Sequence, residues 1–76
     1  MSYGYSTRID SLNQEADQSL LGVRLGRVCI DYDVPAAEVA SQLGVSRQTV
    51  YNWFVGIHEP NPRIAKLIED IIAEYD

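Results

Sequence analysis

The stretch LGVSRQTVYNWFVG, residues 43–56, decides the fold. Gly44 suits the left-handed position that ends a helix, and Ser46 is a favourable N-cap for the next one. At 100° per residue, the side chains that follow Ser46 separate into two faces. The inward face holds Val50, Trp53, Phe54 and Ile57, and the outward face holds Arg47, Gln48, Tyr51 and Asn52, with Thr49 at its margin. Two helices joined by a short turn that contains glycine form a helix-turn-helix.

Two helices are predicted before this turn. The nearer one covers residues 36–43, and Pro35 suits its first turn. The earlier one runs from Leu20 to the break at Asp33, and its apolar residues follow helical spacing. The predicted buried positions of the two helices are Leu21, Leu25, Val28, Cys29 and Tyr32, then Ala36, Val39, Ala40 and Leu43. Gly22 and Gly26 share one face of the earlier helix, so another helix can cross closely there.

The pair Asn61-Pro62 is a strong start signal for a last helix, with Asn as the cap and Pro at the first helical position. This helix is expected over residues 63–75. Its apolar residues are Ile64, Leu67, Ile68, Ile71, Ile72 and Tyr75. The stripe is wider than one helix seam needs, which favours a dimer. The expected interface is Ile68, Ile71, Ile72 and Tyr75; the alternative is a monomer that buries both sides of the stripe in one bundle.

The chain is expected to divide into an N-terminal arm, residues 1–19, and a helical domain, residues 20–76. The first ten residues are rich in Ser and Tyr and show no periodicity, so we expect the arm to be partly flexible. Ser11 followed by Gln14 resembles a capping box, which would start a helical turn near Leu12. The whole pattern predicts an all-α protein, a compact four- to five-helix bundle.

The composition limits the class of protein. An apolar share of 46% in 76 residues is ample for one small core. No apolar run approaches the ~20 residues that cross a bilayer, so no membrane partner is expected. Cys29 stands alone and no disulfide can form within the chain, which suits a cytoplasmic protein. With one histidine, one cysteine and no glycine-rich phosphate loop, we expect no enzyme, no metal and no cofactor.

The net charge of −5 is unevenly spread. Residues 1–19 carry one basic and three acidic residues, and residues 67–76 carry four acidic residues and no basic one. Residues 20–66 carry five basic and four acidic residues. Acidity is therefore concentrated at the two ends, while the middle of the chain can face a phosphate backbone.

An ordered set of residues resembles the Cro-like (Xre-type) helix-turn-helix regulators of phages and bacteria. The set is Leu21-Gly22, Arg24-Leu25, Val39-Ala40, Leu43-Gly44-Val45-Ser46, Val50, Trp53, Gly56 and Pro60. The resemblance implies a lambda-repressor-like DNA-binding domain that binds an operator in double-stranded DNA, usually as a two-fold homodimer. It also implies that the helix beginning at Ser46 enters the major groove, where the base contacts would come from Arg47, Gln48, Tyr51 and Asn52.

These side chains suit that role. Arg can bond bidentately to guanine, and Gln or Asn to adenine. Ser46 and Thr49 suit phosphate contacts at the positive end of the helix dipole. In the family that the chain resembles, the loop after this helix often touches the DNA backbone, which nominates His58, Asn61 and Arg63.

The expected function is a sequence-specific transcriptional regulator, most simply a repressor on a near-palindromic operator. Two alternatives stay open. One is an acidic protein-interaction module of the same fold that binds a transcription component instead of DNA. The other is an architectural protein with little sequence preference, which a chain so poor in basic residues does not favour.

Overall fold

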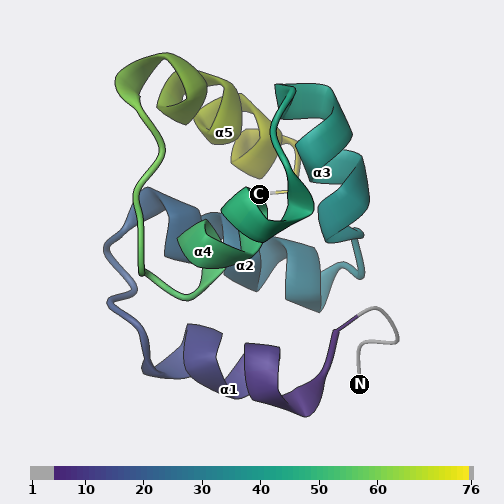
Figure 1. Cartoon of the computed structure of the whole chain (residues 1–76), viewed down its shortest axis with the longest axis vertical. Helices are drawn as coiled ribbons and strands as arrows, with labels where there is room; N and C mark the ends of the chain where they lie inside the picture. The colour runs from purple at the N-terminus through teal and green to yellow at the C-terminus, as the bar shows by residue number, and fades with distance from the viewer. Residues whose placement is uncertain (1–4, 76) are drawn as a thin grey trace.

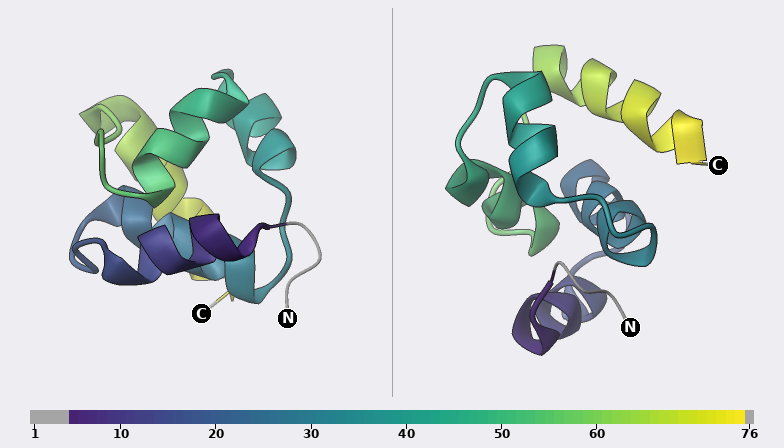
Figure 2. Two further views of the ribbon diagram at one scale, coloured as in Figure 1. Left: turned by 60° about the horizontal axis from the view of Figure 1, so that its bottom comes forward. Right: turned by 90° about the vertical axis from the view of Figure 1, so that its right-hand side faces the viewer.

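The computed structural model describes residues 5–75 as five α-helices with no strand among them. The helices are α1 (Thr7–Glu15), α2 (Leu21–Asp31), α3 (Ala36–Leu43), α4 (Arg47–Phe54) and α5 (Pro62–Tyr75). Helix α2 is central and packs against α1, α4 and α5, while α3 packs against α4 (Figure 1). Figure 2 shows α1 and α5 on opposite sides of α2. The expectation of an all-α bundle with a helix-turn-helix is confirmed.

The helix ends follow the local sequence signals. Gly44 ends α3 in the left-handed region, at φ 70°, and the amide of Val45 donates to the carbonyl of Ala40. Ser46 caps α4 by accepting a hydrogen bond from the Thr49 amide at 3.1 Å. Pro35 occupies the N-cap of α3, one residue earlier than the predicted first turn.

Two glycines allow α4 to cross α2 at close range, as their spacing predicts. A Cβ atom on Gly22 would lie 2.7 Å from the Cβ of Trp53. A Cβ atom on Gly26 would lie 2.9 Å from the Cβ of Phe54. Any larger residue at either position would therefore force α4 away from α2.

The core differs from the predicted stripes at a few positions. Val23 and Ile30 of α2 are buried although they lie outside the predicted stripe, because α2 is covered on three sides. Tyr32, predicted to be inward, is 58% exposed at the end of α2. Ile57 was also expected inward but is 66% exposed. Helix α4 ends at Phe54 and the backbone turns at Gly56, where φ is +80°, so helical periodicity no longer applies to Ile57.

The N-terminal segment departs most from expectation. Residues 1–4, including Tyr3, lie outside the described residues. From Tyr5 onward the chain packs on the domain rather than forming an arm, and α1 is a helix of nine residues. Its cap is Ser6, which accepts from the Ile9 amide at 3.2 Å, so the predicted cap at Ser11 is wrong. Helix α1 buries one side chain, the polar Asn13, which explains why apolar periodicity could not reveal this helix.

Part of the wide apolar stripe on α5 is buried within one subunit. Ile68 and Ile72 are 0% and 4% exposed in the single chain, so most of the surface expected to meet a second subunit is already covered within one bundle. Their place in a dimer interface stays a prediction. Leu67 remains 48% exposed, and Ile71 and Tyr75 are half-buried.

Candidate nucleic-acid interface

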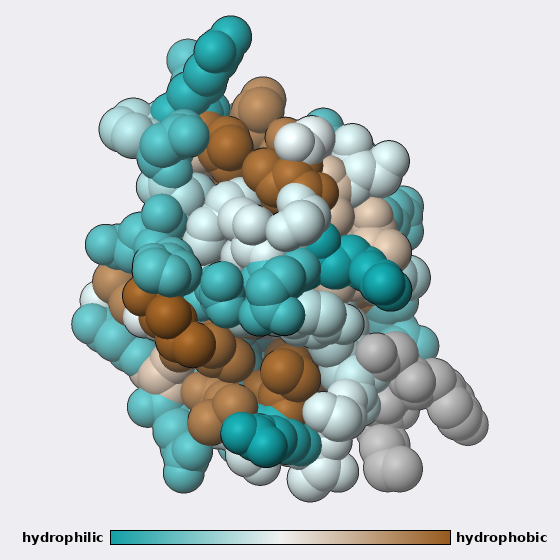
Figure 3. All heavy atoms as spheres, viewed as in Figure 1, coloured by the Kyte–Doolittle hydropathy of each residue, from teal (hydrophilic) through white to brown (hydrophobic). Residues whose placement is uncertain are grey.

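The outward face of α4 is polar and accessible. Arg47 and Gln48 are exposed, and Asn52 is half-buried one turn further on. Gln48 Nε2 donates to Asn52 Oδ1 at 3.0 Å, which holds the two amides side by side. This bond leaves the side-chain oxygen of Gln48, Oε1, and one N–H of its amide free to bond to a base edge. In the space-filling view, the middle of the face over α4 is mainly hydrophilic (Figure 3).

The inward side of α4 holds that polar face in place. Val50, Trp53 and Phe54 are each at most 4% exposed and belong to the main core. Three buried side chains within a helix of eight residues leave it little freedom to tilt or rotate. The predicted inward position of Trp53 agrees with this burial.

Tyr51 is only partly outward. Its ring makes an edge contact with Tyr5, with centroids 6.4 Å apart and an interplanar angle of 82°. A second edge contact joins it to Phe54 at 6.0 Å. Tyr51 therefore reaches the surface from a packed aromatic cluster, unlike the exposed Arg47 and Gln48.

A hollow of about 570 Å³ lies beside α4 and brings together four of the candidate contact residues. Its lining is Val45, Thr49, Asn52, Trp53, His58, Glu59, Pro60, Asn61 and Ile64. Asn61 also caps α5, because its Oδ1 accepts from the Ile64 amide at 2.9 Å. Arg63 is exposed in the first turn of α5 and does not line the hollow. Of the five candidate phosphate contacts, Thr49, His58 and Asn61 line the hollow, and Ser46 and Arg63 lie outside its lining.

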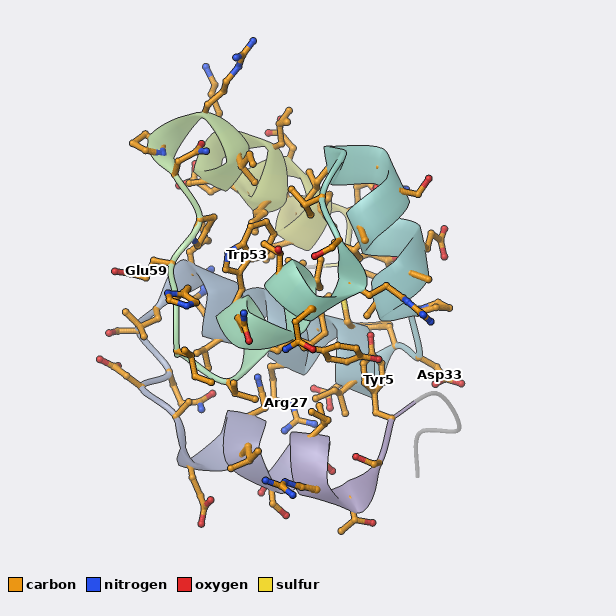
Figure 4. All side chains as sticks on the ribbon, viewed as in Figure 1. Tyr5, Arg27, Asp33, Trp53 and Glu59 are labelled. Atoms are coloured by element: carbon orange, nitrogen blue, oxygen red, sulfur yellow. The ribbon has the colours of Figure 1, made fainter. Side chains whose placement is uncertain are left out.

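The charges near α4 are sparse. Helix α4 carries Arg47 and no acidic residue, but Glu59 lines the hollow. Figure 4 shows Glu59 pointing outward from the loop and away from Trp53. Arg27 is already engaged, with Asp10 and Asp31 oxygens each 3.0 Å away. Ala36, at the start of α3, is buried and has no polar side-chain group that could contact a phosphate.

The described residues 5–75 offer little support for metal binding or for catalysis by the cysteine. They contain no group of three His, Cys, Asp or Glu side chains that could hold a metal ion. Burial raises the pKa of the Cys29 thiol to about 12, so this cysteine stays protonated and is a poor nucleophile. No helix within this range is long and apolar enough to span a bilayer.

Sequence reasoning missed two residues that contact α4 from the N-terminal segment, Tyr5 and Asn13. Tyr5 packs on Tyr51 and Phe54, and Asn13 Nδ2 donates to the Phe54 carbonyl at 2.7 Å. A single buried amide has no periodic signature, and the segment around Tyr5 has none either. Only the cap at Ser6 could have indicated a helix here.

The fold and the polar face of α4 together define a helix-turn-helix DNA-binding domain. A comparison with protein-family models agrees: the family described as Helix-turn-helix (HTH_3) matches residues 32–73, 42 of the 76 residues. The chain belongs to this Xre-like, Cro/C1-type helix-turn-helix family. Regulation of transcription through DNA binding is the kind of function that this membership supports. Searches of curated proteins and of solved structures found no match.

Proposed function

We propose that the protein is a sequence-specific transcriptional repressor that binds a near-palindromic operator as a homodimer. Each subunit inserts α4 into a major groove, with Arg47, Gln48, Tyr51 and Asn52 facing the bases. In a two-fold dimer the two α4 helices would lie about 34 Å apart, one turn of DNA. Repression follows because a bound dimer blocks the access of RNA polymerase.

The observation that carries the proposal is the contrast between the two sides of α4. Arg47 and Gln48 are exposed, whereas Val50 and Phe54 on the opposite side are fully buried. A rigidly anchored helix with exposed donors and acceptors matches what reading base edges in a groove requires. An ordinary solvated helix would not need the amide pair of Gln48 and Asn52 to be pre-aligned.

Phosphate contacts would come from Ser46 and Thr49 at the start of α4, and from His58, Asn61 and Arg63 beyond it. Ser46 Oγ and Thr49 Oγ1 lie 2.9 Å apart, so both hydroxyls occupy the positive end of the α4 dipole. Few of these residues are charged. We therefore expect modest affinity per subunit and a shallow salt slope, since each neutralised phosphate contributes about −0.9 to the slope.

The dimer is supported by apolar surface left at the end of the bundle. Leu67, Ile71 and Tyr75 recur every four residues along α5 and share one face. The Tyr75 ring packs on Tyr32 with centroids 5.0 Å apart, and Tyr32 Oη donates to the Tyr75 carbonyl at 3.1 Å. A second subunit would cover this aromatic pair and the exposed Leu67.

The test is selection from a random double-stranded DNA library at low and at near-physiological salt. An enriched two-fold motif supports the proposal, and its half-site spacing tests the dimer geometry. Arg47→Ala should weaken binding to the selected motif by roughly five- to 150-fold, the range for one lost bidentate base contact. Its melting temperature should stay unchanged, because Arg47 is exposed. Retention of DNA without enrichment would contradict sequence-specific repression.

The acidic charge balance favours a second candidate function, binding of a transcription component through protein contacts. The net charge is −5, and the exposed carboxylates Glu69, Asp70 and Glu74 lie on α5. A wild-type protein that retains no DNA at either salt concentration would support this candidate over the repressor.

A further inference from the structure

Tyr5 contacts α4 and the segment that leads into α3. Its hydroxyl donates to the Val34 carbonyl at 2.5 Å, just before α3 begins. Its ring packs on two residues of α4, with centroids 6.4 Å from Tyr51 and 6.0 Å from Phe54. Burial raises the pKa of the Tyr5 hydroxyl above its ordinary value, with a smaller contribution from Cys29, so the hydroxyl remains a donor. Figure 4 shows Tyr5 between the start of α1 and α4.

Asn13 holds the C-terminal end of α4. Its Nδ2 donates to the Phe54 carbonyl at 2.7 Å and to the Val23 carbonyl of α2 at 3.0 Å. The Phe54 carbonyl belongs to the last turn of α4, whose carbonyls have no partner within the helix. The Asn13 side chain is 0% exposed.

The environment of Asn13 indicates that its two N–H groups matter more than its volume. Asn13 Oδ1 is buried with no hydrogen-bond partner in the described part of the chain, which is unfavourable. An apolar side chain would avoid that cost but could not donate to the Phe54 carbonyl. Gly26 provides the room, because a Cβ there would lie 2.5 Å from Asn13 Nδ2.

From these contacts we propose that Tyr5 and Asn13 are positioning residues for DNA reading: they set the base preference of α4 without touching DNA. The proposal rests on the proposed function of α4. Tyr5 acts through Tyr51, because the Tyr51 ring cannot turn without displacing the edge contact with Tyr5. Asn13 acts through Phe54, because its hydrogen bond fixes how far the last turn of α4 lies from α2. Both residues lie outside the family match at residues 32–73.

The experiment compares Tyr5→Ala, Tyr5→Phe and Asn13→Ala with the wild-type protein. The measured quantity is the relative affinity for a panel of DNA sites that differ by single bases. Tyr5→Ala should change the preference at one base position by roughly two- to tenfold, the range expected from losing an aromatic pair. Tyr5→Phe keeps the ring contacts and should keep the wild-type preference. Asn13→Ala should change the preference at positions read from the Asn52 end of α4.

A purely structural role predicts different results. The matched control is Ile72→Val, a core truncation on α5 that should lower the melting temperature without changing base preference. Tyr5→Ala made in a Tyr51→Ala background should cause no further change in preference, because its route through Tyr51 is gone. Uniformly weaker binding of Tyr5→Ala and Asn13→Ala to every site, as for a partly unfolded protein, would overturn the proposal.

A second measurement, made without DNA, separates failure of this proposal from failure of the proposed function. NMR can follow the flip rate of the Tyr51 ring and the amide exchange of Val55 and Gly56. If the wild-type protein binds no DNA, the proposed function fails. Faster ring flips in Tyr5→Ala and faster exchange in Asn13→Ala would then still support the positioning of α4. Unchanged rates in both variants would overturn it.

Discussion

Helices α1 and α4 begin in the same way but are anchored differently. Each follows a serine whose hydroxyl accepts from the third amide of the helix, Ser6 from Ile9 and Ser46 from Thr49. Helix α4 then buries three apolar side chains, whereas α1 buries only Asn13. Equal caps therefore lead to helices of different strength, because tertiary packing supplies most of the stability of a short helix.

The two kinds of anchor respond to different perturbations. Apolar burial on α4 depends on volume and is insensitive to pH. Helix α1 depends on the Asn13 amide and on the contact of Asp10 with Arg27, whose atoms lie 3.0 Å apart. We expect α4 to fail only with the whole domain, while α1 can loosen on its own.

The largest effect is expected from Phe54→Ala, which removes a fully buried anchor of α4. Truncation of a buried Phe costs about 3–5 kcal/mol. A domain of this size has a total stability of roughly 4–11 kcal/mol, so the variant should be at the edge of unfolding. The matched control on the outward face, Gln48→Ala, should change stability by no more than about 0.5 kcal/mol. Urea denaturation followed by circular dichroism measures both, and similar losses would contradict the division of α4 into two faces.

The sequence predicted α4 far better than α1, and the reason is physical. Val50, Trp53 and Phe54 repeat at helical spacing, and Gly44 and Ser46 mark the turn and the cap. These signals are local and additive, so α3, α4 and the start of α5 could be placed within about one residue. Burial of Asn13 depends on the two carbonyls that it meets, which belong to residues 10 and 41 positions further along the chain.

The candidate site was predictable to a similar degree. The exposed positions Arg47 and Gln48 follow from helix geometry, as does the half-exposed Asn52. The packing of Tyr51 against Tyr5 could not be predicted, because the contact joins residues 46 positions apart. The exposure of Ile57 was missed because the left-handed Gly56 ends the periodicity there.

A somewhat smaller effect is expected from Gly26→Ala, which acts where α1, α2 and α4 meet. The new Cβ would lie 2.5 Å from Asn13 Nδ2 and 2.9 Å from the Cβ of Phe54. Overpacking of this kind costs about 1–3 kcal/mol, partly offset by about 1 kcal/mol from the better helix propensity of Ala. Thermal unfolding should show a lower melting temperature.

Combining the variants tests which contact dominates at Gly26. The double variant Asn13→Ala/Gly26→Ala removes the closer of the two clashes. Its loss of stability should therefore be smaller than the sum of the two single losses. Strict additivity would show that the Cβ is resisted by Phe54 alone and that Asn13 does not share the site.

The two caps give a direct comparison of α1 with α4. Removing an N-cap serine costs about 1 kcal/mol. For Ser46→Ala we expect this loss in the stability of the whole domain, because α4 is part of the core. For Ser6→Ala we expect little change in global stability and faster amide exchange confined to residues 7–15. Equal losses of global stability would show that α1 unfolds together with the core and is not the weaker of the two helices.

The smallest effect is a pH dependence confined to α1. The hydrogen bond from Gln14 at 3.0 Å, followed by the contact with Arg27, holds the pKa of Asp10 below its ordinary value. A carboxyl whose pKa is lowered on folding stabilises the fold above its unfolded pKa. That contribution is lost as the pH falls through the folded pKa, so α1 should loosen below about pH 4.

Amide exchange in residues 7–15 and in α4, measured between about pH 6 and pH 2.5 after correction for intrinsic rates, tests this expectation. In the wild-type protein α1 should lose protection at a higher pH than α4, because the three buried side chains that anchor α4 in the core, Val50, Trp53 and Phe54, do not titrate. Asp10→Asn keeps an oxygen for Gln14 but has no charge, so it should have weaker α1 protection at pH 6 and a flatter response to acid. Asp17→Asn is the matched control: its pKa is also lowered, by hydrogen bonds from Ser19, but it lies beyond the end of α1 and its hydrogen bonds do not involve Arg27. If α1 and α4 lost protection at the same pH in every variant, α1 would be as firmly part of the core as α4, and its polar anchors would not form a separate, weaker attachment.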